Sequence, residues 1–353
     1  MKNTLSAAKE AVSLKKNNKR KLTRVAVLAV LMAVFLVIVV ITELYIYPLG
    51  YLWSLFGKYG IPARGKGEFR VHFLDVGQGD CAILEFPDGT TMIIDGGDGS
   101  HECVKTILRY SHSLGIDKFD RMLLTHSDAD HAGGLDDVLR VFGADTIYIP
   151  DAEKDEGSAY TEFISEAEDS GSEMLITRKY QYFLSKDRDF PFSGMFIWPL
   201  RLTEEGMDSN DRSAVLWLEY AGRSFLFTGD ISETAENSLA DAQEVLGDEA
   251  FSYGPVSTDW GEEIMLSPDL TKIDFLKVAH HGSASSSSLR FLEMISPETA
   301  FIGVGAGNAY LHPTKETIEN LLSVGADVYR TDEYGCCMLT VSADGSFSVK
   351  STG

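Results

Sequence analysis

The stretch Leu123–Leu135, LLTHSDADHAGGL, constrains the fold of this chain more than any other segment. Four side chains that can bind a cation lie within six residues, directly after a short apolar run that we expect to form a strand: His126, Asp128, Asp130 and His131. Imidazole and carboxylate together suit divalent Zn, Mn or Fe. Without a cation the two aspartates would repel each other. The motif therefore predicts a metal site in a loop after a strand, and the two glycines that follow leave room to turn into a helix.

Polar side chains also follow later apolar segments. Asp230 ends FTGD after an apolar run, His280 and His281 follow another, and His312 lies in YLHP. Taken singly, each is explained as well by a turn cap, a polar strand end or a surface histidine. Their order after the first motif favours one shared site, because α/β folds gather their chemistry at the carboxyl ends of strands.

The spacing of apolar residues predicts a mixed α/β domain in which strands first pair as hairpins and then alternate with helices. We expect strands at 69–74, 81–86, 91–94, 121–125, 146–149, 195–198, 214–220, 224–228, 275–279, 300–304, 327–330, 336–341 and 347–349. We expect helices at 104–114, 134–142, 151–171, 232–246, 287–295 and 314–323. Two mixed sheets with helices outside would satisfy this order. The acidic segment 247–272 fits neither pattern, and we interpret it as an irregular insertion.

Seventeen uninterrupted apolar residues, 25–41, precede this domain, and a helix of that length is about 25 Å long, near the lower limit for crossing a bilayer. Basic residues lie directly before it, so the positive-inside rule places the N-terminus in the cytoplasm and the domain outside. We predict a single-pass protein of the cell membrane with a basic cytoplasmic tail (1–24), a transmembrane helix (25–47), a linker (48–67) and an extracytoplasmic domain (68–353). A cleaved signal peptide is the alternative, but no small-residue cleavage site follows.

The charge of the chain is divided unevenly. The first 24 residues hold eight basic side chains and one acidic side chain, so the rest of the chain carries a net charge of −29. This excludes a broadly basic nucleic-acid-binding surface for the main domain. The four cysteines lack C-x-x-C spacing, so we expect no zinc ribbon and interpret them as small buried residues.

The order of five short motifs resembles the metallo-β-lactamase superfamily: DVGQGD (75–80), IIDGG (93–97), THSDADHAGG (125–134), FTGD (227–230) and HHGS (280–283). More narrowly, it resembles the hydrolase domain of the ComEC family of DNA-uptake and competence proteins. The resemblance covers residues 68–350. It implies an αββα metallo-β-lactamase sandwich with a pair of metals at the strand ends, here preceded by a single transmembrane helix.

The resemblance also implies a role for each motif residue. His126 and Asp128 would bind the first metal, Asp130 and His131 would bind the second, and Asp230 would bridge both. Many members of the superfamily have a second histidine where this chain has Asp128.

The remaining motif residues would complete the site or support it. His280 is the preferred last ligand because it directly follows the predicted strand, and His281 would replace it or contact substrate. Asp95 would be a buried carboxylate that steadies the histidine-rich loop. His312 would touch a phosphate, and Ser283 would hold phosphate oxygens unless its serine-rich loop is purely structural.

One departure concerns the first metal. Many members have another histidine ligand in the middle of the chain, but this sequence has none between residues 131 and 280. Asn210, Asp211 or water would have to complete that site. We expect two divalent ions, Zn or Mn, and the carboxylate-rich set leans toward Mn.

These residues indicate a metal-dependent hydrolase, and the resemblance to competence proteins points to a phosphodiesterase or nuclease acting on single-stranded DNA or a small phosphodiester. Asp130 would accept the proton of a metal-activated water, and His280, His281 or His312 would neutralise the departing oxygen. A small-molecule ester or cyclic-nucleotide hydrolase is one alternative, because an acidic surface repels a small ligand less. A non-catalytic, metal-stabilised binding domain is the other. The predicted partners are the membrane, through the single helix, and single-stranded DNA or a small phosphodiester; no protein partner is identified.

Overall fold

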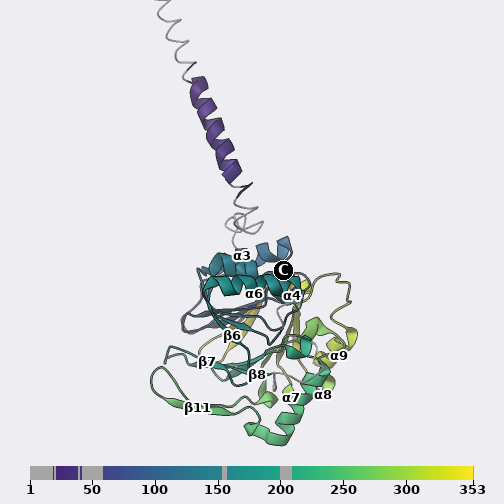
Figure 1. Cartoon of the computed structure of the whole chain (residues 1–353). Helices are drawn as coiled ribbons and strands as arrows, with labels where there is room; N and C mark the ends of the chain where they lie inside the picture. Colours follow the sequence, from purple (N-terminus) through teal and green to yellow (C-terminus); the bar gives the residue numbers. More distant parts are fainter. Residues whose placement is uncertain are drawn as a thin grey trace, which may run out of the picture. The chain divides into compact units, whose positions relative to one another are not determined.

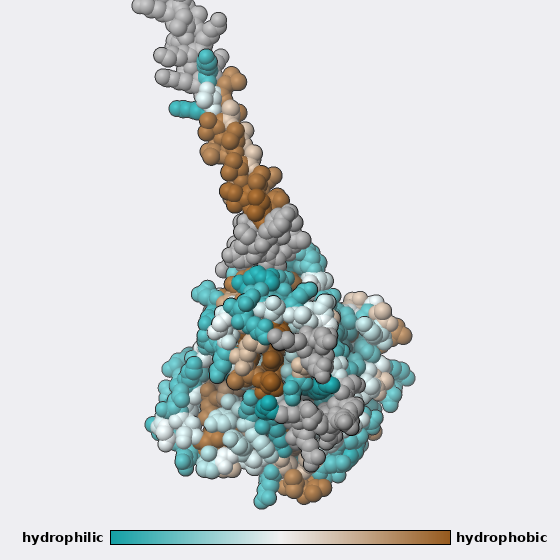
Figure 2. All heavy atoms as spheres, viewed as in Figure 1, coloured by the Kyte–Doolittle hydropathy of each residue, from teal (hydrophilic) through white to brown (hydrophobic). Residues whose placement is uncertain are grey.

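The computed structural model describes residues 19, 21–38, 40–41, 59–152, 157–198 and 209–352. The chain divides into two compact units, Met1–Leu52 and Trp53–Gly353. In the first unit, Lys21–Ile38 form a helix with a mean hydropathy of 2.3, which has the length and composition of a membrane span. Its apolar side chains are exposed along its length (Figure 2). Much of the predicted basic tail and linker, and the end of the predicted span at 42–47, lie outside the described residues.

The second unit contains two large sheets. The first has eight strands in the order β17-β16-β1-β2-β3-β4-β5-β6, and the second has seven in the order β15-β14-β13-β10-β9-β8-β7. The strands of the first sheet are β1 Phe69–Phe73, β2 Ala82–Glu85, β3 Thr91–Ile94, β4 Phe119–Leu123, β5 Ala144–Ile149, β6 Glu173–Ile176, β16 Cys337–Val341 and β17 Phe347–Ser351. Those of the second are β7 Tyr182–Leu184, β8 Phe192–Trp198, β9 Val215–Tyr220, β10 Arg223–Phe227, β13 Phe275–Lys277, β14 Thr299–Ile302 and β15 Asp327–Arg330.

Helices cover the outer faces of both sheets. Figure 1 shows α3 and α6 on one side of the strands and α7, α8 and α9 on the other. The helices are α3 His101–Leu114, α4 Ala129–Ala132, α5 Leu135–Phe142, α6 Ser158–Ser170, α7 Glu233–Leu246, α8 Leu289–Ile295, α9 Lys315–Ser323 and α10 Thr331–Tyr334. The predicted αββα sandwich is therefore confirmed.

Strand β1 shows how the sequence produces this layering. Alternate residues Phe69, Val71 and Phe73 enter the apolar core between the two sheets, as the two-residue period of a strand requires. Phe73 stacks on Phe301 of the opposite sheet with ring centroids 4.1 Å apart. His72 points the other way and contacts Tyr110 of α3, so both faces of β1 are buried.

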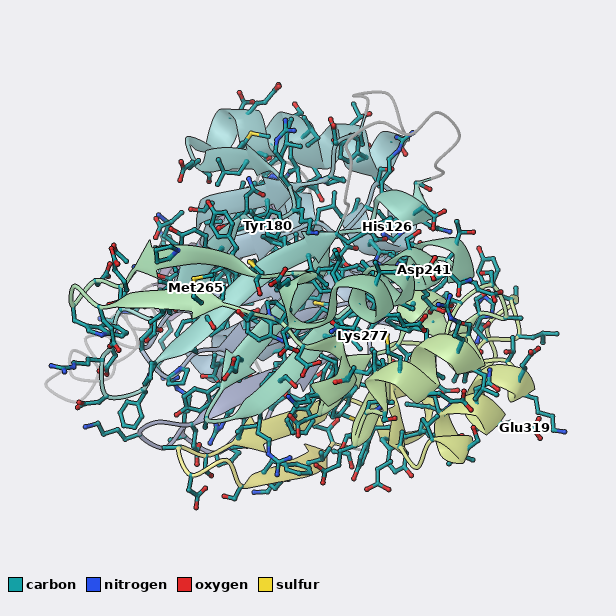
Figure 3. All side chains as sticks on the ribbon, turned by 90° about the horizontal axis from the view of Figure 1, so that it is seen from below. His126, Tyr180, Asp241, Met265, Lys277 and Glu319 are labelled. Carbon is teal, nitrogen blue, oxygen red and sulfur yellow. The ribbon has the colours of Figure 1, made fainter. Side chains whose placement is uncertain are left out.

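The segment 247–272 is more regular than predicted. It contains the hairpin β11 (Tyr253–Ser257) and β12 (Glu263–Leu266), which pair antiparallel as a separate two-stranded sheet. The acidic residues interrupt the alternation of apolar residues that would have predicted these strands. Val256 and Leu266 are nevertheless buried, in the same apolar cluster as residues of α7. Figure 3 shows Met265 of β12 apart from His126, toward the left of the view.

Other element predictions also need correction. Strands β6 and β7 were not predicted. The helix expected at 151–171 begins at Ser158 in the structure, and residues 153–156 lie outside the described chain. The four cysteines are all buried and form no disulfide, which agrees with their interpretation as small buried residues.

Candidate metal centre

The loops that follow β3, β4, β10 and β13 lie at one edge of the sandwich, because the strands within each pair are parallel. In the first sheet β3 and β4 are parallel, and the chain continues beyond them to Asp95 and His126. In the second sheet β10 and β13 are parallel, and the chain continues to Asp230 and His281. The carboxyl ends of parallel strands lie at the same edge of a sheet, which is where α/β folds place ligands.

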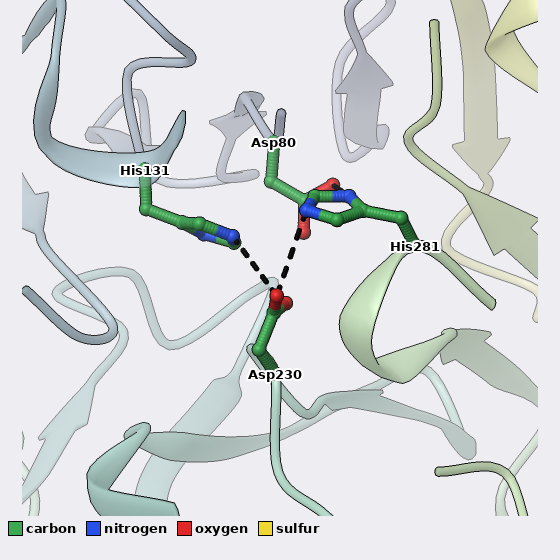
Figure 4. Close-up of side chains that lie close together, drawn as sticks. All are labelled: Asp80, His131, Asp230 and His281. Carbon is green, nitrogen blue, oxygen red and sulfur yellow. Dashed lines mark ion pairs between the residues drawn. The ribbon is translucent and has the colours of Figure 1, made fainter. Parts of the chain in front are cut away.

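The inner half of the centre consists of Asp130, His131, Asp230 and His281. The Oδ2 atom of Asp230 lies 3.3 Å from Nε2 of His131 and 3.5 Å from Nε2 of His281 (Figure 4). The same nitrogen of His281 lies 3.3 Å from Oδ2 of Asp130. His131, Asp230 and His281 are buried, whereas the Asp130 side chain is 34% exposed. Four ligand atoms from two sheets therefore converge, with one open to solvent.

The outer half consists of His126 and Asp128. The Nε2 atom of His126 lies 3.8 Å from Oδ2 of Asp128, and the His126 ring lies 4.1 Å from the His131 ring. His126 is fully buried, but the Asp128 side chain is 43% exposed. The outer half therefore adjoins the inner half and is more open to solvent.

The polar atoms of the centre fit divalent cations. The Nε2 atoms of His126, His131 and His281 are buried and have no hydrogen-bond partner within the described residues. A buried polar atom without a partner is costly, and bound cations would give these three nitrogens partners. A mixed imidazole and carboxylate set suits Zn or Mn. The residues present therefore fit a metal centre.

The electrostatics of the inner half point the same way. Burial alone would lower the pKa of His131 and His281, but neighbouring carboxylates outweigh it, raising the pKa of His131 well above its usual value and that of His281 to about 10. Burial would likewise raise the pKa of Asp230, yet His131 and His281 hold it well below its usual range. The carboxylates of the inner half therefore favour a positive charge there, which a metal ion would supply. By contrast, burial and repulsion from His131 lower the pKa of His126 to about 3, which keeps it neutral and able to bind a metal.

Asp95 fixes the orientation of His131. Its Oδ2 atom lies 2.9 Å from Nδ1 of His131, and its two oxygens accept hydrogen bonds from the backbone N–H and the hydroxyl of Thr125, both at 2.8 Å. A metal-binding histidine commonly has such a carboxylate behind its second nitrogen. Asp95 therefore lies where the predicted supporting role requires.

Asp80 was missed as a site residue, although it ends the quoted motif DVGQGD. Its Oδ1 lies 3.5 Å from Nδ1 of His281, which also donates to the Gly303 carbonyl at 2.8 Å. Asp80 forms a buried ion pair with Lys277, and although burial opposes ionisation, Lys277 and His281 lower its pKa to about 2. A carboxylate oxygen of Asp80 lies within 4.8 Å of a potential ligand atom of each of His131, Asp230 and His281. Asp80 therefore lies next to the Nδ1 atom of His281, as Asp95 lies next to the Nδ1 atom of His131.

The structure reverses the predicted order of preference between His280 and His281. Strand β13 ends at Lys277, two residues earlier than predicted, so His280 does not directly follow the strand as the preference for it assumed. Both histidines have positive φ, 50° and 52°, and this turn buries His281 in the centre. His280 points away, with Nδ1 3.3 Å from the Ser285 hydroxyl and its ring 5.8 Å from His312.

Ser283 and Asp211, two other predicted residues, make hydrogen bonds with neighbouring segments of the chain. The Ser283 hydroxyl contacts the Ser285 hydroxyl at 2.9 Å, within its own loop. The Asp211 Oδ1 accepts a hydrogen bond from the Ser232 N–H at 3.0 Å, just before α7. The Asn210 Oδ1 is buried and has no hydrogen-bond partner among the described residues.

Comparison with known proteins places this geometry in a family. The model of the metallo-beta-lactamase superfamily matches residues 74–305. ComE operon protein 3 of Bacillus subtilis is 28% identical over 76% of this chain and 33% of its own length. Competence protein ComA of Neisseria gonorrhoeae is 27% identical over 82% of this chain and 35% of its own length. The chain therefore spans about a third of the length of these curated relatives. Among solved structures, the metallo hydrolase Igni18 from Ignicoccus hospitalis is 13% identical, with a TM-score of 0.42, over 80% of this chain and 100% of that one.

Proposed function

Since the chain belongs to the metallo-beta-lactamase superfamily of metal-dependent hydrolases, we propose that it is a membrane-anchored phosphodiesterase that cleaves single-stranded DNA. The supporting observation is the position of Asp230, whose carboxylate contacts His131 and His281 and interacts electrostatically with His126 of the adjoining half. A carboxylate shared by two cations is the arrangement that can clamp the attacking and leaving oxygens of a phosphodiester. Relatives named as competence proteins favour DNA as the substrate.

Each residue has a part in this proposal. His126 and Asp128 would hold one cation, His131, Asp130 and His281 the other, and Asp230 both. When bound, the two cations would polarise the phosphate and ionise a water near neutral pH.

The chain itself would supply orientation and proton transfer. Asp130 combines partial exposure with a pKa that remains below its usual value, because His281 and His131 outweigh its burial, so it is ionised and can accept a proton. His281 is buried in the ligand cluster, so we assign it to metal binding rather than to protonation of the departing oxygen. That role passes to His312, whose Nδ1 is buried without a hydrogen-bond partner among the described residues.

The orientation in the membrane is part of the proposal. The basic residues at the N-terminal side of the helix Lys21–Ile38 support a cytoplasmic N-terminus and a hydrolase domain outside, by the positive-inside rule. A phosphatase reporter that is active only outside the cytoplasm, fused after residue 353, should be active in cells. An inactive phosphatase fusion beside a fluorescent cytoplasmic reporter at the same position would reverse the orientation.

A small phosphodiester, such as a cyclic nucleotide, is the second candidate. The observation that favours it is the net charge of −29 on residues 25–353, which repels a long polyanion more than a small ligand. High salt should therefore accelerate DNA cleavage if long-range repulsion limits it, whereas cleavage of a small phosphodiester should change little.

The full-length chain in detergent, loaded with Mn²⁺ or Zn²⁺, tests the proposal on labelled single-stranded DNA. We expect cleavage that needs metal and is lost in Asp130→Ala/His131→Ala. The matched control is Asp145→Ala, an exposed carboxylate near the start of β5, the end of the strand opposite the centre. Two bound metals without DNA cleavage would shift the proposal to small phosphodiesters and esters. A chain that binds metal but turns over none of these substrates would favour a binding domain.

A further inference from the structure

The loop Gly305–His312 presents two exposed apolar side chains close to the metal centre. Tyr310 is 67% exposed and Leu311 81%. Among the aromatic side chains described in residues 59–352, none is more exposed than Tyr310. Large apolar side chains exposed together beside a site commonly mark a contact surface.

The loop is held in place rather than loosely extended. The Asn308 side-chain amide donates to the carbonyls of Gly305 at 3.0 Å and His312 at 2.7 Å, and its oxygen accepts from the His312 N–H at 3.0 Å. One side chain thus closes the loop through three hydrogen bonds. Tyr310 is therefore exposed on an ordered turn, which lowers the entropic cost of using it for binding.

A row of rings connects Tyr310 to the metal centre. The ring centroids are 6.3 Å apart for His281 and His280, 5.8 Å for His280 and His312, and 5.8 Å for His312 and Tyr310. The rings of Tyr310 and His312 are nearly parallel, at 16°. Tyr310 is thus the outermost of four rings, and its exposed face lies beyond the residue proposed to protonate the departing oxygen.

We propose that Tyr310 stacks an unpaired nucleobase of the nucleotide next to the phosphodiester held at the metal centre. This inference rests on the proposed phosphodiesterase function and specifies its substrate as a base-bearing single strand. An aromatic face accepts any base, so recognition is independent of sequence. A paired base has both faces covered by its neighbours in the duplex, so the platform selects single strands.

Stacking would also help an acidic domain to bind a negatively charged strand. A net charge of −29 on residues 25–353 gives no broadly basic surface that would attract a strand. Stacking needs no positive charge and is worth enough per base to support binding. Tyr310 therefore supplies an attraction that the charge of the domain does not.

The test compares two oligomers of equal charge on the metal-loaded full-length chain in detergent. One is a short labelled oligothymidylate, and the other is an abasic oligomer of the same length and label. We expect Tyr310→Ala to lower kcat/KM for the oligothymidylate about tenfold or more and to leave the abasic oligomer unchanged, because only the first substrate can stack. Tyr310→Phe keeps the ring and should behave like the parent chain.

The control variant is Met265→Ala, which removes an exposed apolar side chain on β12, away from the centre (Figure 3). It should alter neither substrate. Equal losses on both oligomers in Tyr310→Ala would mean that the change disturbs the loop, and no loss on either would mean that the ring is idle. Each of these results overturns the inference.

Binding separates this inference from the proposed function. Fluorescence anisotropy measures the affinity of both oligomers for the same metal-loaded chain, whether or not it cleaves them. Tighter binding of the oligothymidylate that is lost in Tyr310→Ala, without cleavage, would retain the stacking platform and reject the nuclease. Equal binding of the two oligomers, or binding of neither, would overturn the platform even if small phosphodiesters are hydrolysed.

Discussion

The inner half of the metal centre differs from the outer half in how firmly its side chains are held. In the inner half, His131 is backed by Asp95, and His281 by Asp80 and the Gly303 carbonyl. In the outer half, the Nδ1 of His126 contacts the neighbouring Thr125 hydroxyl, at 3.1 Å. Its partner Asp128 has a side chain that is 43% exposed.

This difference indicates that the inner half determines metal affinity and that the outer half is accessible to substrate. A side chain fixed by buried partners loses little entropy when it binds a metal, so the inner half should hold its cation tightly. The open outer half should hold a cation more weakly and leave positions for substrate oxygens. The comparison therefore predicts one firmly bound metal and one exchangeable metal.

The largest expected effect follows from breaking the inner half. His131→Ala removes a ligand that is buried and contacts Asp230 at 3.3 Å. We expect loss of both metals and a fall in kcat/KM of about 10³-fold or more, since the cations provide most of the catalysis. Elemental analysis after dialysis, together with a hydrolysis assay, measures this. A variant that keeps its metal and its activity would remove His131 from the centre.

Breaking the outer half should cost less. Asp128→Ala is expected to leave about one metal per chain, because the inner ligands and their supports are unchanged. Hydrolysis should fall about 100-fold, since one cation of the pair is weakened. The same two measurements apply, with Asp145→Ala as the control. If Asp128→Ala loses metal as completely as His131→Ala, the two halves are equivalent and the comparison fails.

The aspartates behind the histidines should have intermediate effects. Asp95→Asn keeps the size of the side chain but weakens the support of His131, so metal affinity should fall about 10–100-fold. Competition with a metal-sensitive chelating dye measures this affinity.

Asp80→Asn should reduce metal affinity by a similar factor and also destabilise the fold, because it leaves the buried ammonium of Lys277 without its partner. Breaking one side of a buried pair costs about 3–5 kcal/mol. Urea unfolding should therefore separate Asp80→Asn from Asp95→Asn. Equal unfolding free energies for the two variants would show that the Asp80–Lys277 pair adds nothing to stability.

The smallest effect concerns the loop that follows His281. Glu236 of α7 accepts hydrogen bonds from the backbone N–H groups of Ser287 and Ser288, and its burial raises its pKa to about 7. Between pH 5 and 6.5 the folded chain keeps this proton while the unfolded chain loses it, so stability falls as pH rises. The change attributable to Glu236 is about 1–2 kcal/mol.

Urea unfolding at several pH values measures this slope. Glu236→Gln should flatten it, whereas the exposed residue Glu244 provides the control as Glu244→Gln. An unchanged slope in Glu236→Gln would mean that the buried carboxyl titrates alike in both states. The free energy of unfolding would then not depend on the charge of Glu236.

The sequence predicted the parts of the centre that local patterns encode. His126, Asp128, Asp130 and His131 lie within six residues, and Asp230 closes an apolar strand, so each could be identified from its own segment. The sandwich also followed from the order of strands and helices.

The missed features depend on contacts between distant segments. Asp80 supports His281 across 201 residues, and no local pattern pairs them. The choice between His280 and His281 depended on where β13 ends, a boundary that shifted by two residues. The hairpin β11–β12 has its apolar residues separated by exposed ones, so its burial became visible only against α7.

Strand β1 pairs with β2 on one side and with β16 on the other, where Phe69 lies opposite Val341. During synthesis, β1 is therefore made about 270 residues before its partner strand β16. Until then one edge of an apolar strand is unpaired, and such an edge invites association with other chains. Contacts this distant also slow folding. The hydrolase should therefore mature only after nearly all of its chain has been synthesised, and a truncation just before β16 should aggregate rather than give a smaller active domain.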